Sequence, residues 1–186
     1  MKLMSIALNT YREAIRNRIL YSIFFFALLV VGIAALLGAA SVGDQMKFVK
    51  DFSLMSVSLF GAVIAIVLGV NLLSKELGKR TILNILSKPV ARWEFIVGKF
   101  LGLFATLALV VVLMCAVLVL ILALFEGRLD WGMVLASGTA LMELMIVTAF
   151  SLFFSSLVVT PTLAGLFTAS AFVAGRSSSY LGYFLG

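Results

Sequence analysis

Long apolar runs constrain this chain more than any other feature. Four of them contain at least 20 residues each, at about 19–42, 52–73, 100–125 and 131–154. A helix rises about 1.5 Å per residue, so about 20 apolar residues cross a hydrocarbon core about 30 Å thick. The chain has 186 residues and is 63% hydrophobic, which is more than a soluble core of this size can bury. The sequence therefore predicts an all-α polytopic membrane protein.

The segment before the first run, residues 3–18, has the pattern of an amphipathic helix. Apolar residues recur every three or four positions, as at Met4, Leu8, Tyr11 and Ile15, and polar residues occupy the other face. This pattern is typical of a helix that lies at the membrane interface. A signal peptide is the competing interpretation, but the charged segment is long and no A-x-A cleavage site follows.

A shorter apolar segment covers residues 161–175 and is predicted to be a fifth span. Thr160 and Pro161 form a typical helix start, with threonine as N-cap and proline at the first helical position. The polar and aromatic tail at 176–186 is expected to be re-entrant or interfacial. We expect a sixth span that the chain as given does not contain.

The charged residues predict the orientation in the membrane. With a cytoplasmic N-terminus, ten lysines and arginines lie inside and only four lie outside, namely Lys47, Lys50, Arg128 and Arg176. The positive-inside rule favours this orientation. Residues 74–99 then form the one sizeable cytoplasmic loop. The expected localisation is a bacterial cytoplasmic (inner) membrane.

Several kinds of chemistry are excluded by residue types. The chain has no histidine and one cysteine, Cys115, so neither a familiar transition-metal site nor a Ser-His or Cys-His nucleophile can be assembled. The motif G-x-x-x-x-G-K-[ST] is absent, so the chain lacks the usual loop for nucleotide phosphates. The cations flank apolar runs, which indicates membrane topology rather than nucleic-acid binding. We therefore expect no enzyme activity, no metal and no cofactor in this chain.

Small residues recur at four-residue spacing in two of the predicted spans. They are Gly61, Ala65 and Gly69 in the second span, and Gly165 with Ala169 in the fifth. Such spacing lets helices approach closely in lipid, so these positions are predicted to form packing seams between spans or subunits. Abundant small residues in membrane helices are the simpler explanation.

Glu143 is the one carboxylate deep within a predicted span. A charge at that depth costs at least about 2.5 kcal/mol on insertion scales, so the side chain should face protein or water. It is a candidate intramembrane polar site, on a substrate or proton path. A structural contact with a polar neighbour such as Thr139, Thr148 or Asn71 is the alternative.

The loop at residues 74–99 reads SKELGKRTILNILSKPVARWEFIVGK and holds six of the fourteen cations. Ile82, Leu83, Ile85 and Leu86 predict a short helix with an apolar face, and Pro89 ends it. An apolar face away from any span must be covered by lipid or by a partner protein. A plain topology loop with ordinary anchors is the other interpretation.

This loop resembles the signature of ABC-2 type transporter permeases, E…GT…LLS-x-P-x-x-R…GK. The matching positions are Glu76, Arg80, Thr81, Ile85, Leu86, Ser87, Pro89, Arg92, Gly98 and Lys99. NTYREAIRNRILY and SSLVVTPTLAGLFT are similar to two further regions of such permeases, so the likeness covers essentially the whole chain. The chain departs from the pattern at Arg80, where the family has glycine, and in lacking a sixth span.

The resemblance implies one transmembrane permease domain over residues 1–186, in an ATP-driven transporter of export type. Two permease copies, as a homo- or heterodimer, would form the translocation path, and a separate cytoplasmic ATPase would hold ATP and Mg²⁺. The helix at 81–87 would be the coupling helix in a cleft of that ATPase, with lipid and an extracytoplasmic protein as further partners. Two other hypotheses stay open: a non-transporting scaffold or mechanotransmission component, and an ATPase-independent channel or secondary transporter.

Overall fold

The computed structural model describes residues 2–40, 45–78, 92–126, 131–158 and 160–185, and the regular structure in these ranges is entirely α-helical. Its helices are α1 (Lys2–Ile15), α2 (Arg18–Ala40), α3 (Gln45–Gly78), α5 (Arg92–Glu126), α6 (Trp131–Leu157) and α7 (Pro161–Leu185). The predicted all-α membrane fold is confirmed. Helices α3 and α5 extend well beyond the apolar runs from which they were predicted.

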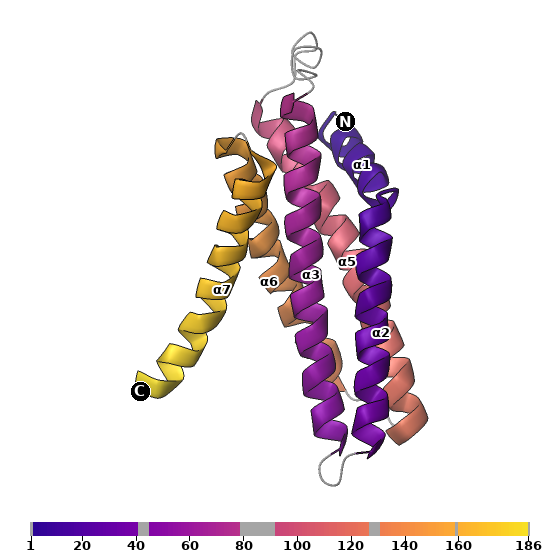
Figure 1. Cartoon of the computed structure of the whole chain (residues 1–186). Helices are drawn as coiled ribbons and strands as arrows, with labels where there is room; N and C mark the ends of the chain where they lie inside the picture. The colour runs from indigo at the N-terminus through magenta and orange to yellow at the C-terminus, as the bar shows by residue number, and fades with distance from the viewer. Residues whose placement is uncertain (1, 41–44, 79–91, 127–130, 159, 186) are drawn as a thin grey trace.

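The helices form a bundle in which α3 contacts α2, α5, α6 and α7 (Figure 1). The core lies along α3 and α5, with a contribution from α6. Its largest buried side chains include Ile64, Leu68, Leu72, Leu103, Leu107, Met114 and Leu144. The outer faces remain apolar, since Phe25, Val112 and Met142 are exposed, as expected for helices that contact lipid.

Helix α7 differs from the other long helices. It packs on α6 and α3 near its start and diverges from the bundle toward its C-terminal end (Figure 1). It also continues without a break past Gly175, where the predicted fifth span ends. The side chain of Arg176 has polar partners inside the bundle, described below, and this allows the helix to carry a charge at that depth.

Length and apolarity identify candidate membrane spans among the described residues. Within the described ranges, three helices can cross a membrane, over Val49–Leu72, Trp93–Ile121 and Leu135–Leu157, or four if the bent pair α1–α2 counts as one span. Helix α7 is not among them, because Arg176 and the serines after it reduce the apolarity of its second half.

The small residues of α3 lie in a close contact with α6. A Cβ atom on Gly61 would lie 2.6 Å from Cδ1 of Leu144, and Gly69 lies directly against Ser151. Gly165 of α7 is different, because a Cβ atom there would lie 3.9 Å from Ile66, an ordinary contact distance. Helix α3 is therefore packed more tightly against α6 than against α7.

Helices α1 and α2 meet at an elbow of 61°. The side chain of Asn17 accepts a hydrogen bond from the backbone N–H of Ile19 at 3.0 Å, so it caps the start of α2. This cap lets the chain leave the interface helix and turn along the bundle with fewer unpaired backbone donors.

We expect Asn17→Ala to lower the free energy of unfolding by about 0.5–2 kcal/mol, the usual value of an N-cap. Asn17→Asp keeps a side-chain acceptor and should retain most of the stability. Denaturant titration in detergent micelles measures both, with Asn9→Ala, an exposed asparagine on α1, as control. Equal stability of Asn17→Ala and Asn9→Ala would show that the cap is unimportant.

Candidate functional site

Glu143 forms an ion pair with Arg176. One guanidinium nitrogen, Nη1, lies 3.1 Å from Oε1 of Glu143, and each side chain is 35% exposed. Glu143 comes from α6 and Arg176 from α7, so the pair connects the diverging helix to the bundle. The two formal charges cancel, which lowers the cost of placing both within the apolar region.

The depth of the pair follows from the turn between α6 and α7. Glu143 lies 14 residues before the end of α6 at Leu157, and Arg176 lies 15 residues after the start of α7 at Pro161. At about 1.5 Å per residue, both lie about 21–23 Å from the turn. Two antiparallel helices thus bring opposite charges to the same level, near the middle of α6.

Ser58 of α3 completes the cluster. Its hydroxyl donates to Oε2 of Glu143 and accepts a hydrogen bond from Nη1 of Arg176 at 3.0 Å. Both N–H groups of Nη1 are therefore accounted for, one by the glutamate and one by the serine. Within the described part of the chain, Nε and Nη2 of Arg176 have no hydrogen-bond partner.

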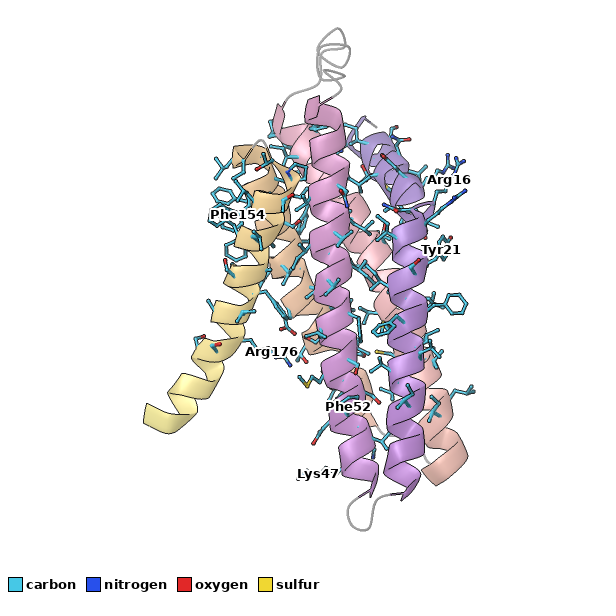
Figure 2. The ribbon with its side chains drawn as sticks, viewed as in Figure 1. Arg16, Tyr21, Lys47, Phe52, Phe154 and Arg176 are labelled. Carbon is cyan, nitrogen blue, oxygen red and sulfur yellow. The ribbon has the colours of Figure 1, made fainter. Side chains whose placement is uncertain are left out.

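The cluster lies at one side of a cleft between α6 and α7, and Figure 2 shows Arg176 in the space between α7 and the bundle. The cleft has a volume of about 540 Å³. Its lining is mostly apolar, apart from the ion pair and one threonine. The lining residues are Glu143, Ile146, Val147, Phe150, Thr168, Ala171, Phe172, Gly175 and Arg176.

The sequence indicates Glu143 as a polar site within a span but does not indicate its partners. Thr139 and Thr148 instead donate hydrogen bonds to the carbonyl groups of Ala136 and Leu144 in their own helix. Arg176 was placed outside the membrane because the apolar run ends at residue 175. The equal distances of the two charges from the helix turn are the signal that could have found the pair.

Most of the predicted coupling residues lie outside the described residues. This applies to Arg80, Thr81, Ile82, Leu83, Ile85, Leu86, Ser87 and Pro89, and to the side chains of Glu76 and Arg92. The backbones of both residues are described. Glu76 belongs to the last turn of α3, and Arg92 belongs to the first turn of α5.

The base of that loop is held by Lys99, the last residue of the signature. Its side chain is only 3% exposed, and Nζ donates to the carbonyl oxygen of Leu72 at 3.4 Å. The same ammonium lies 5.2 Å from the centre of the Phe95 ring, within the range of a cation–π interaction. Lys99 therefore joins the start of α5 to the last third of α3.

The interface helix α1 packs against the same end of α5. A Cβ atom on Gly102 would lie 2.5 Å from the carbonyl oxygen of Ala7 and 2.7 Å from Cβ of Thr10, so the contact needs glycine. A second, polar cleft of about 730 Å³ lies at the elbow beside this contact. It is lined by Asn9, Arg12, Glu13, Arg16, Asn17, Arg18 and Leu72.

Comparison with known protein families identifies the chain. The family described as ABC-2 family transporter protein matches residues 4–175, which is most of the sequence. The chain belongs to the ABC-2 transporter family. No curated protein matches the sequence. The ABC-2 match includes most of α1, the loop at 74–99, and Ser58 and Glu143, and its last residue immediately precedes Arg176. The chain is thus an integral membrane permease subunit of an ABC transporter.

Proposed function

We propose that this permease subunit is driven by a separate cytoplasmic ATPase that docks on residues 74–99. The observation that carries the proposal is the arrangement of the two helices that flank this stretch. Lys99 holds α5 against α3 at the level of Leu72, and α1 packs on α5 at Gly98 and Gly102. A force applied to residues 79–91 therefore acts on three helices at once.

This arrangement supports transport by rigid-body motion. An ATPase that closes on ATP and Mg²⁺ would push the coupling segment, and α3 and α5 would tilt together because Lys99 joins them. Helix α1 would follow α5, since the two helices are in close contact at Gly102. Two permease copies, identical or homologous, would enclose the path, and repetition of the cycle would export the substrate.

The proposed orientation places the N-terminus in the cytoplasm of a bacterial cell and the chain in its inner membrane. The distribution of cations supports it, with ten on the proposed inner side. Arg176 was counted among the outer cations. Because Arg176 instead pairs with Glu143 within the bundle, the difference in the number of cations between the proposed inner and outer sides increases.

We expect Ile85→Asp to abolish the coupling of ATP hydrolysis to this subunit, because it places a charge on the apolar face of the predicted 81–87 helix. Asn84→Asp is a matched control that adds the same charge at a polar position next to it. Each variant is purified from membranes with its ATPase, and ATP hydrolysis per complex is measured. Normal assembly and hydrolysis in Ile85→Asp would contradict the docking site.

A further inference from the structure

We infer that the α6–α7 cleft binds a single-chain amphiphile with a zwitterionic phosphate head group. The phosphate lies on Arg176, the head-group ammonium on Glu143, and the alkyl chain along the apolar wall. This binding site would select the class of molecule that the permease transports. Its role in transport rests on the function proposed above.

The first observation is that the guanidinium of Arg176 has N–H donors that are not used within the cluster. A guanidinium carries five N–H donors, and Nη1 uses its two on Glu143 and Ser58. The three donors on Nε and Nη2 have no partner among the described residues, although Arg176 is only 35% exposed. Adjacent Nε and Nη2 donors form the planar edge that binds two oxygens of a phosphate or carboxylate. Such a head group would satisfy donors that are costly to leave unpaired in an apolar medium.

Charge balance is the second argument, and it selects a zwitterion over an anion. Glu143 already cancels the charge of Arg176, so a purely anionic ligand would leave a net charge within the membrane. A head group with one phosphate and one ammonium keeps the occupied site neutral. Each carboxylate oxygen of Glu143 accepts one hydrogen bond in the cluster, and each has a second acceptor site for an ammonium donor.

The walls of the cleft supply the third argument. Ile146 and Phe150 of α6 face Phe172 of α7 across the cleft, and its volume of about 540 Å³ lies within the usual range for ligand sites. Ile146 is 59% exposed and Phe150 43% exposed, so this wall continues to the lipid-facing surface. Because these lining side chains are also exposed on the outer surface of α6, an alkyl chain has a lateral entry from the bilayer.

Photolabelling of the purified permease in dodecyl maltoside, without ATPase or ATP, tests the inference. The probe is a single-chain phosphoethanolamine amphiphile with a diazirine on its alkyl chain. Two comparison probes have the same chain with a phosphate-only or an amine-only head group. We expect the phosphoethanolamine probe to label residues within 146–172 most strongly, with competition by the unlabelled amphiphile and none by inorganic phosphate.

Arg176→Lys is the decisive variant, because it keeps the charge and a donor for Glu143 but removes the Nε–Nη2 edge. Labelling should fall about tenfold, as for loss of a charge-assisted hydrogen bond. Arg16→Lys, at the elbow, is the matched control and should label normally. Phe172→Ala shortens the wall without touching the ion pair and should also weaken labelling, so the test does not depend on one variant. Thermal unfolding shows that each variant is folded.

Three results would overturn the inference: unchanged labelling in Arg176→Lys, labelling elsewhere in the chain, or competition by inorganic phosphate, which would indicate a site for free phosphate. Equal labelling by the phosphate-only probe would overturn its zwitterionic part. These results leave the ATPase proposal intact, because that proposal is tested by Ile85→Asp, a variant expected to label normally.

Discussion

Arg176→Leu is expected to lower the free energy of unfolding by about 1–3 kcal/mol and to release α7 from the bundle. The substitution removes both hydrogen bonds from Nη1 and leaves Glu143 without its opposite charge. Breaking a fully buried pair costs about 3–5 kcal/mol, and the smaller range here reflects side chains that are 35% exposed. Denaturant titration in micelles measures the change.

A double-mutant cycle separates the pair from its surroundings. Glu143→Gln alone removes the negative charge and should also destabilise the protein, whereas adding it to Arg176→Leu should recover part of the loss, because no unpaired charge remains. Lys47→Leu is the control. It removes an exposed cation near the start of α3 and should have little effect on the free energy of unfolding. Additive effects of the two substitutions would show that Glu143 and Arg176 do not interact energetically.

Gly102→Ala is expected to destabilise the protein by about 1–3 kcal/mol, because the added methyl group overpacks the contact between α1 and α5. Its Cβ would lie 2.5 Å from a backbone oxygen of α1, which cannot move without shifting that helix. Glycine to alanine in an open helix position normally stabilises by about 0.5–1 kcal/mol, so the sign of the effect is diagnostic. ATP hydrolysis in the purified complex should fall as well, since α1 would no longer follow α5.

Gly138→Ala supplies the control for this substitution. Gly138 also lies in a helix, and a Cβ atom there would have no atom within 4 Å. It should be neutral or stabilising, with normal ATP hydrolysis. If Gly102→Ala behaved in the same way as Gly138→Ala, the close packing of α1 on α5 would be contradicted.

The sequence predicted the architecture well because lipid imposes a simple length rule. Runs of at least 20 apolar residues mark α2, α3, α5 and α6, and the pattern of residues 3–18 marks α1. The glycines of α3 were predicted as a seam, but their partner was not, because four-residue spacing does not specify the opposing helix. The structure places Gly61 on Leu144 and Gly69 on Ser151, both in α6.

The candidate site was harder to predict because its residues are far apart in the sequence. Ser58 and Glu143 are separated by 85 residues, and the third member of the cluster, Arg176, lies in the second half of α7. An apolar run that stops at a charge is normally read as the end of a span. Here the helix continues past the charge, because Arg176 has a partner on the neighbouring helix and lies beside the α6–α7 cleft.

Reconstitution into proteoliposomes tests the central claim, that this subunit transports only when a separate ATPase drives it. The permease is purified with its native partners and reconstituted so that the ATPase side faces outward. Uptake of the phosphoethanolamine amphiphile into these proteoliposomes is measured with and without ATP. We expect a copurifying ATPase that contains a P-loop, and uptake that needs both ATP and that subunit. Uptake by the permease alone without ATP would contradict this claim, as would a complete native complex that contains no ATPase.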